Sequence, residues 1–231
     1  MRRRLQDARL VPLGEAAWLL SFESRLSLEA NARVLAVADA LSRQRAPGVR
    51  DIVPAVSSLA VHFDPDTTDP ETVAHVISGC LDAEATPDGA RVIELPVCYG
   101  GEHGPDLPEV AEFAGCTTEE VVERHLAPEY RVLMLGFLPG FPYLGVVDER
   151  IAMPRRAAPR AHVAAGSVAI AGRQTGVYPT RSPGGWRVIG RTPLTLFDPG
   201  TDPPARLGPG DRVRFRRIDA ATFTRFPLEG E

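Results

Sequence analysis

The residues best suited to chemistry gather in four glycine-rich segments, residues 99–106, 136–145, 165–179 and 182–193. The first places a glutamate, a histidine and an aspartate among three glycines, which let the backbone approach a ligand closely. The second holds three aromatic side chains and two prolines between glycines, a stiff apolar wall that can line a pocket or form half of an interface. Each segment taken alone also fits a structural role, as a tight surface turn or as a loop that fills the core.

The third and fourth segments add polar groups that suit an anion. In the third, an apolar strand leads to Arg173, Gln174 and Thr175, whose side chains can hold a carboxylate, an amide or a phosphate. In the fourth, glycines next to Trp186 free backbone amides to face an anion above an apolar floor. Residues 150–197 include eight arginines and no carboxylate, which favours an anionic small molecule or an acidic partner surface, with a solvated basic face as the alternative.

Several kinds of catalysis are excluded by residues that the chain lacks. It contains no lysine, so it can supply neither a Schiff-base lysine nor the lysine of a P-loop. No Gly-x-Ser-x-Gly elbow occurs, and the five histidines show no metal-binding spacing such as His-Glu-x-x-His. The residues alone therefore predict a two-domain protein with an arginine-rich, glycine-lined anion pocket, and they identify neither a catalytic base nor a metal site.

Composition predicts a cytoplasmic globular protein. The 231 residues are 44% hydrophobic and 24% charged, and no apolar run is long enough to predict a membrane span. The basic start is followed by polar residues where a signal peptide needs an apolar stretch. Three widely spaced cysteines, Cys80, Cys98 and Cys116, predict buried thiols rather than disulfides or a zinc site. Nucleic acid is not an expected partner, because the arginines lack the interleaved aromatics of a base-stacking surface.

Charge is distributed unevenly along the chain. Residues 64–129 carry 16 acidic and 2 basic side chains, whereas residues 130–231 carry 8 acidic and 15 basic ones. The acidic segment suits docking to a basic partner subunit, and it equally suits binding to a regulatory target protein.

The first third of the chain predicts a small α+β domain, residues 1–86, built as a split β-α-β sandwich. Ser27 predicts the start of one helix, and Asp69 followed by proline predicts the start of another. A turn is expected at residues 12–14. Alternating apolar residues predict strands at 16–22, 50–54 and 58–63.

The remainder, residues 90–231, predicts a β-barrel or a β-sandwich behind a boundary at residues 84–89. A strand at 91–97 leads into two short helices, one from Leu107 and one opened by a capping box at Thr117. Short apolar strands then alternate with glycine and proline, at 132–137, 167–171, 186–189, 194–197 and 212–218.

Three of the glycine-rich segments together resemble the allophanate hydrolase subunit 1 family, also called the KipI-like family or the family of the 5-oxoprolinase B subunit. The matching residues read Gly-Phe-x-Pro-Gly-Phe-x-Tyr-Leu-Gly at 136–145, Gly-Ser-Val-x-Ile-Ala-Gly-x-Gln-Thr-Gly at 166–176 and Ser-Pro-Gly-Gly-Trp at 182–186. Further matches at 12–14 and 51–55 extend the resemblance over nearly the whole chain.

The resemblance implies a cyclophilin-like β-barrel behind the small α+β domain, and it implies partners. An obligate C subunit, of the allophanate hydrolase subunit 2 type, is expected as a separate protein, because the chain ends at Glu231. An A subunit of the LamB/YcsF type completes an ATP-dependent 5-oxoprolinase. That enzyme converts 5-oxo-L-proline, ATP and water into L-glutamate, ADP and phosphate. ATP is then bound by the complex, and not necessarily by this chain.

The resemblance also implies a binding site for an anionic small molecule. Its arginines, with Arg173 among them, bind the anion, although the family commonly has glycine at position 173. Gln174 and Thr175 orient the amide, and aromatic side chains wall the site. The expected site residues are Phe137, Pro139, Gly140, Phe141, Arg155, Gln174, Thr175, Gly176, Gly184, Gly185, Trp186 and Arg191.

Two alternatives from the same family stay open at this point. Some members bind a sensor histidine kinase and inhibit it, and the acidic segment is compatible with such binding. The same pair of domains also serves as the carboxyltransferase part of urea carboxylase, which would require biotin-carrier and carboxylase modules from other proteins. Peptidyl-prolyl isomerase activity would rest on analogy of fold alone, because no residue pattern supports it.

Overall fold

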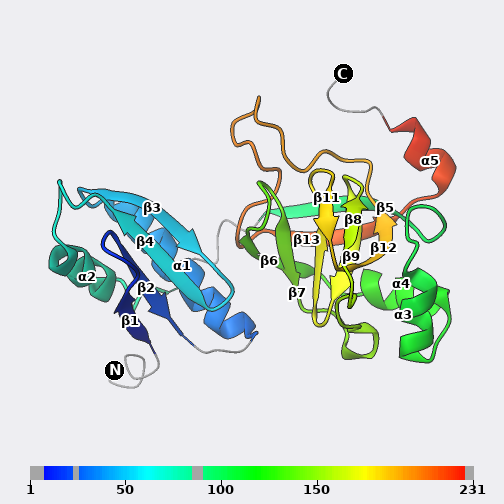
Figure 1. Ribbon diagram of the computed structural model, residues 1–231, viewed down its shortest axis with the longest axis horizontal. Helices are drawn as coiled ribbons and strands as arrows, with labels where there is room; N and C mark the ends of the chain where they lie inside the picture. Colours follow the sequence, from blue (N-terminus) through cyan, green and yellow to red (C-terminus); the bar gives the residue numbers. More distant parts are fainter. Residues whose placement is uncertain (1–7, 23–25, 85–90, 227–231) are drawn as a thin grey trace. The chain divides into compact units, whose positions relative to one another are not determined.

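The computed structural model describes residues 8–22, 26–84 and 91–226, and Figure 1 shows their helices and strands. The chain divides into two compact units, Met1–Gly89 and Ala90–Glu231. The predicted boundary at residues 84–89 lies, apart from Glu84, outside the described residues. No helix within the described ranges is long and apolar enough to cross a membrane.

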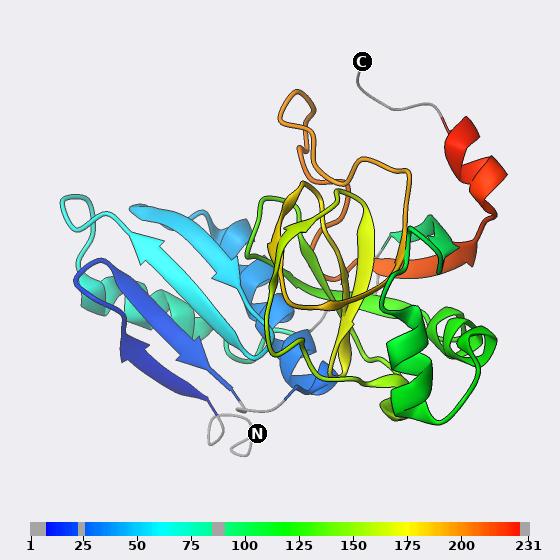
Figure 2. The same cartoon turned by 45° about the vertical axis from the view of Figure 1, so that its right-hand side comes forward.

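The N-terminal unit is a four-stranded antiparallel sheet with both of its helices on one face (Figures 1 and 2). The strand order is β1-β2-β4-β3. Because β2 and β3 both pair antiparallel with β4 between them, they are parallel to each other and are connected through α1. This is the predicted split β-α-β arrangement. The elements are β1 (Arg9–Pro12), β2 (Ala17–Ser21), α1 (Leu28–Gln44), β3 (Val49–Pro54), β4 (Ser58–Phe63) and α2 (Pro70–Gly79).

Side-chain caps determine where these two helices begin. Ser27 Oγ accepts the N–H of Ala30 at 3.1 Å, at the start of α1. Asp69 accepts the N–H of Thr72 at 2.8 Å, and Pro70 occupies the first turn of α2, where its missing N–H leaves no bond unmade. Both predicted helix starts are confirmed.

The C-terminal unit is a closed barrel of seven strands in the order β10-β7-β6-β13-β5-β12-β9 (Figure 2). Its first and last strands along the chain, β5 and β13, pair in parallel, and the other neighbouring strands pair antiparallel. A separate two-stranded ribbon joins β8 to β11. The strands are β5 (Val92–Tyr99), β6 (Tyr130–Leu135), β7 (Pro142–Gly145), β8 (Arg160–Val163), β9 (Ser167–Ala171), β10 (Gln174–Val177), β11 (Ser182–Gly184), β12 (Arg187–Arg191) and β13 (Arg212–Arg217).

Short helices accompany the barrel and position the loops beside it. α3 (Leu107–Ala114) packs against β12, and α4 (Thr118–Leu126) packs against β13. The predicted capping box at Thr117 is confirmed, since its side chain and that of Glu120 satisfy each other's backbone N–H groups. A 3₁₀ turn, η1 (Glu149–Ile151), and a C-terminal helix, α5 (Ala220–Arg225), complete the unit.

The barrel unit holds two apolar clusters. The larger fills the barrel with alternating inward residues of its strands, and the helices α3 and α4 add their apolar faces to it. The smaller contains Phe141, Val163, Ala169, Tyr178, Trp186 and Val188. The predicted fold class, an α+β unit followed by a closed β-barrel, is confirmed.

Several strand predictions were incomplete or wrong. The expected strand at 194–197 forms only a single bridge, between Phe197 and Ala205. Strands β1, β7, β8, β10 and β11 were not predicted, because each has only three or four residues and four of them contain proline or glycine. Their pairing partners, rather than a local apolar pattern, hold them in place: β7, for example, lies between β6 and β10.

Candidate functional site

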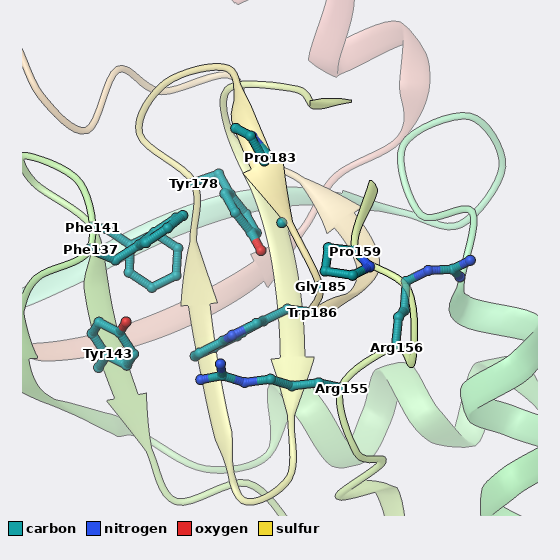
Figure 3. A pocket seen from close by; sticks show the side chains of 11 residues that line it. Phe137, Phe141, Tyr143, Arg155, Arg156, Pro159, Tyr178, Pro183, Gly185 and Trp186 are labelled. Carbon is teal, nitrogen blue, oxygen red and sulfur yellow. The ribbon is translucent and has the colours of Figure 1, made fainter. Parts of the chain in front are cut away.

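A pocket of about 270 Å³ lies against the smaller apolar cluster of the barrel unit (Figure 3). Six of the predicted site residues line it together with five others. They come from the loop before β7 and β7 itself, from the segment before β8, and from the segment between β10 and β12. The lining residues are Phe137, Phe141, Tyr143, Arg155, Arg156, Pro159, Tyr178, Pro183, Gly184, Gly185 and Trp186.

The wall of the pocket is a set of interlocked aromatic rings centred on Phe141. The Phe141 centroid lies 5.0 Å from that of Tyr143, 5.1 Å from that of Tyr178 and 5.5 Å from that of Trp186, all in edge-on orientation. Edge-to-face pairs contribute about 0.5–1.5 kcal/mol each beyond the area they bury. The rings therefore hold one another in place and form a preorganised apolar surface.

Two glycines let these rings sit where they do. A Cβ on Gly176 would lie 3.0 Å from Phe141 Cζ and 2.9 Å from the carbonyl oxygen of Pro142. A Cβ on Gly184 would lie 2.8 Å from Tyr178 Cζ. The glycines of the third and fourth segments thus admit aromatic rings here, in addition to the ligand-facing role expected of them.

Phe137 stands apart from the other rings because it is 61% exposed. Its φ of 68° lies in the left-handed region, which costs a residue with a side chain about 1–2 kcal/mol. Its ring centroid lies 5.7 Å from that of Phe141, at the edge of the pocket. An exposed aromatic residue held in a strained conformation suits contact with a ligand better than stabilisation of the fold.

Arg155 supplies the positive charge of the pocket. Its guanidinium carbon lies 5.6 Å from the Trp186 ring centroid, and Figure 3 shows the side chain running beside that ring. No ion pair of Arg155 is present among the residues that the structure describes. Burial raises the pKa of Tyr178 above its ordinary value, so its hydroxyl stays protonated at neutral pH and can donate a hydrogen bond.

Other arginines of the carboxylate-free stretch are paired with carboxylates of the same unit. Arg156 and Arg160 bind the buried Asp106, and Arg187 binds Glu109. The acidic segment 64–129 therefore neutralises part of the basic stretch within this chain, a pairing that the sequence did not predict. Arg155 is left available to an anion in the pocket.

The structure places Thr175 in the barrel interior and not at the pocket. Its side chain is fully buried, donates to the Ala169 carbonyl at 2.9 Å and lies 3.0 Å from His125 Nε2. The other ring nitrogen, Nδ1, lies 2.8 Å from the Tyr99 hydroxyl. Because the Thr175 proton is used by Ala169, the Thr175 oxygen accepts from Nε2–H, and Tyr99 donates to Nδ1. Burial lowers the pKa of His125 to about 3, so the ring is neutral.

Two predicted anion-binding arginines also lie elsewhere. Arg173 forms an ion pair with Glu149 at 3.0 Å, and both side chains are exposed. Arg191 donates from Nε to the Ala165 carbonyl at 2.7 Å, and its guanidinium lies over the ring of Phe223. Neither arginine lines the pocket that contains Arg155.

The remaining predicted residues do not line the pocket. Pro139 is exposed in the loop before β7, and Gly140 packs closely against the side chain of Phe197. Gln174 begins β10, opposite Gly145 and Ala171. Their roles as ligand-binding groups stay predictions.

Five lining residues were not predicted as site residues. Tyr143, Tyr178 and Pro183 lie inside the glycine-rich segments already singled out, so the motifs contained the signal. Arg156 and Pro159 lie just beyond Arg155 in the basic stretch. Only the folded structure distinguishes Arg155, whose side chain faces the pocket, from Arg156, whose guanidinium is directed away from it (Figure 3).

The pocket suits binding more than acid–base chemistry. Its lining contains no carboxylate, histidine or cysteine. Across the described part of the chain, no group of three or more His, Cys, Asp or Glu could hold a metal ion. The three cysteines are free thiols, two of them buried and Cys116 partly so. The arrangement can therefore hold a small flat ring between aromatic walls and one negative charge at Arg155.

Comparison with known proteins identifies relatives over nearly the whole chain. The family model described as carboxyltransferase domain, subdomain C and D, matches residues 8–207. The 5-oxoprolinase B subunit of Bacillus subtilis (strain 168) is 43% identical over 230 residues, covering 94% of this chain and 95% of that protein. The 5-oxoprolinase B subunit of Escherichia coli O157:H7 is 43% identical over 212 residues, covering 91% and 96%.

Solved structures share the fold. TTHA0988 matches with a TM-score of 0.80 at 42% identity, over 88% of this chain and 40% of that one, so this chain spans about 40% of its length. PH0987 from Pyrococcus horikoshii is 47% identical over 93% of this chain and all of that one, with a TM-score of 0.57. The K. lactis urea amidolyase matches 94% of this chain and 15% of its own at 20% identity, with a TM-score of 0.74, which indicates a shared fold.

Proposed function

The chain belongs to the family of the carboxyltransferase domain, subdomain C and D, and of the 5-oxoprolinase B subunit, and on this premise we propose that it is the substrate-binding subunit of an ATP-dependent 5-oxoprolinase. The enzyme opens the lactam of 5-oxo-L-proline to L-glutamate while ATP and water become ADP and phosphate. The name of the relatives implies partner subunits, and we propose that these are of the A and C types.

The observation that carries the proposal is the match between pocket and substrate. 5-Oxoproline is a small ring with one carboxylate and one neutral amide. Arg155, which has no ion pair among the described side chains, offers a planar pair of donors to a carboxylate. The rings of Phe141 and Trp186 offer apolar faces to the methylene groups of the lactam.

A neutral hydroxyl donor fits the chemistry that the lactam must undergo. A lactam carbonyl is a poor electrophile, and phosphorylating its oxygen activates it towards water. Before that step, the Tyr178 hydroxyl can donate to an oxygen of the substrate, and its raised pKa keeps the proton in place. The aromatic walls exclude bulk water, which strengthens both interactions.

The nucleotide and the catalytic base are assigned to the assembled complex. The chain has no lysine for a P-loop, and its pocket contains no acid or histidine to act as a base. We place the complex in the cytoplasm, where ATP is available.

Reconstitution tests the proposal directly. This chain is mixed with purified A and C subunits, and glutamate release from 5-oxo-L-proline is measured with and without ATP. The expected result is glutamate formation that requires all three proteins and ATP. A stable, folded complex that releases no glutamate would overturn the proposal, and inhibition of a sensor kinase and biotin-dependent carboxyl transfer would be assayed next.

A further inference from the structure

Two consecutive arginines of the segment before β8 have opposite directions. Both residues line the pocket, but Arg155 runs along Trp186 towards it, whereas the guanidinium of Arg156 is directed away from it (Figure 3). The Arg156 guanidinium reaches the carboxylate of Asp106 at 3.0 Å. Because Arg155 and Arg156 are adjacent in the chain, the position of Arg155 is coupled to Asp106, which does not line the pocket.

Asp106 joins three parts of the barrel unit at this point. It lies at the N-cap of α3, and its carboxylate oxygens accept two bonds from Arg160, at 2.6 and 2.7 Å. The same carboxylate accepts the N–H of Val188 in β12 at 2.7 Å, and the Asp106 N–H donates to the Val188 carbonyl at 2.9 Å. α3, the segment before β8 and the start of β12 are thus held by one side chain.

The groups held by Asp106 are neighbours of the pocket lining. Arg160 begins β8 and directly follows Pro159, and Val188 lies two residues after Trp186. The Arg156 N–H also donates to the Gly185 carbonyl at 2.7 Å, which ties the same segment to the glycine pair of the pocket. Displacement of the segment would move Arg155, Pro159 and Gly185 together.

The carboxylate is buried, with 1% of its side chain exposed. Burial alone would raise the pKa of Asp106, but the Arg160 and Val188 hydrogen bonds and the charges of Arg160 and Arg156 outweigh it, so the pKa is lowered and the group is ionised at neutral pH. A buried charge with four donors is well suited to fix geometry, because losing any partner leaves the charge incompletely satisfied.

We propose that Asp106 is the positioning residue of the pocket, which orders the 155–160 segment and the start of β12 so that Arg155 and Trp186 keep their places. The inference rests on the proposed function for its kinetic readout and on the geometry alone for its structural readout. Asp106 does not touch the substrate.

The kinetic test compares Asp106→Asn with the matched control Asp211→Asn in the reconstituted complex. Asp211 is also a buried carboxylate of the barrel unit; it binds Arg91 through two bonds and the Gly208 N–H, away from the pocket. We expect Asp106→Asn to raise the KM for 5-oxoproline about tenfold or more, since misplacing a binding group by about 1 Å costs up to about a hundredfold. Asp211→Asn is expected to leave KM within about twofold of wild type. Equal KM values for the two variants would overturn the proposal.

Arg160→Gln keeps the test decisive if Asp106→Asn does not fold. Arg160 is 28% exposed and lies outside the pocket lining, and both of its side-chain hydrogen bonds go to Asp106. We expect the same direction of change in KM, and a double variant no worse than Asp106→Asn alone, because both act through one interaction. Additive effects would show independent roles and contradict the proposal.

A structural readout separates this inference from the proposed function. In a Trp18→Phe background, Trp186 is the only tryptophan of the chain, and it is 5% exposed. On the full chain by itself, Asp106→Asn is expected to raise the acrylamide quenching constant of Trp186 at least about twofold, and Asp211→Asn to leave it unchanged. If this occurs in a chain whose complex has no oxoprolinase activity, the proposed function fails and the positioning role stands. Unchanged quenching in Asp106→Asn would overturn the positioning role itself.

Discussion

The barrel unit contains two buried polar clusters that differ in charge and in what lies next to them. Asp106 is ionised and is bound by Arg156 and Arg160. Arg156 is the chain neighbour of Arg155, the cation of the pocket. His125 is neutral and lies between Tyr99 and Thr175 in the barrel interior. Both clusters satisfy the central side chain, but only the first is connected to residues that line the aromatic pocket.

The difference separates residues that serve the fold from residues that serve the ligand. The neutral cluster is closed, because each polar atom of the His125 ring has a partner inside the barrel and none faces the pocket. The charged cluster is ordered by the ion pairs of the buried Asp106 with Arg156 and Arg160, and it leaves the neighbouring Arg155 facing the pocket. Substitutions in the first should therefore change stability, and substitutions in the second should change binding.

Lowering the pH should reduce the free energy of unfolding mainly through His125 of the neutral cluster. Since the folded pKa of His125 is about 3 and that of an unfolded histidine is about 6.5, the unfolded state binds the extra proton, and stability present above pH 6.5 is lost as the pH falls towards 3. The expected loss is about 2 kcal/mol between pH 7.5 and 5, and about 3 kcal/mol by pH 4. Urea unfolding followed by Trp186 fluorescence in the Trp18→Phe background measures it.

The control for that prediction is His125→Gln, which cannot titrate. Its unfolding free energy should lack the part of the pH dependence that arises between pH 6.5 and 5, whatever its stability at pH 7.5. A variant with the same slope as wild type over this range would assign the pH dependence to other groups.

Thr175→Val should destabilise the barrel without affecting the substrate. The substitution keeps the shape of the side chain and removes the acceptor of the His125 N–H, which leaves a buried donor unsatisfied at a cost of about 1–3 kcal/mol. The KM for 5-oxoproline in the reconstituted complex should stay within about twofold of wild type. A large rise in KM with unchanged stability would contradict this account and would support the amide-orienting role that the family resemblance implied for Thr175.

Phe137→Gly should have the smallest effect on stability. In contrast to Thr175→Val, it should raise the KM for 5-oxoproline. Glycine relieves the strain of a φ of 68°, and the lost ring contacts are few because Phe137 is 61% exposed. We expect an unfolding free energy within about 0.5 kcal/mol of wild type and a KM raised about threefold to tenfold. Thermal melting and steady-state kinetics on the same preparation check both. A destabilised variant with normal KM would identify Phe137 as a structural residue.

The sequence predicted the wall of the pocket better than its charges. Phe137, Phe141 and Trp186 belong to rigid motifs whose glycines and prolines constrain them locally, so their grouping could be predicted. The function of each arginine could not, because Arg155 and Arg156 are adjacent and chemically identical in the sequence. Their directions depend on Asp106, about 50 residues earlier in the chain.

The elements of the fold show the same difference between features fixed by neighbouring residues and features fixed by distant ones. Helix starts at Ser27, Asp69 and Thr117 were predictable, because a cap and its partner lie within three residues of each other. Strand β10 was not, because it has only four residues and its pairing with β7 depends on a segment distant in the sequence. For the same reason the burial of Thr175 inside the barrel was not predictable from a polar tip bounded by glycines.

The most direct test of the substrate site compares two arginines for which the same anion-binding role was predicted. Arg155 lines the aromatic pocket, whereas Arg173 is paired with Glu149 and lies outside the pocket lining. In the reconstituted complex, Arg155→Gln is expected to raise the KM for 5-oxoproline about a hundredfold, as expected for loss of a charged hydrogen bond to the substrate, and Arg173→Gln should leave it within about twofold. Equal effects, or a larger effect at Arg173, would contradict the assignment of this pocket as the substrate site.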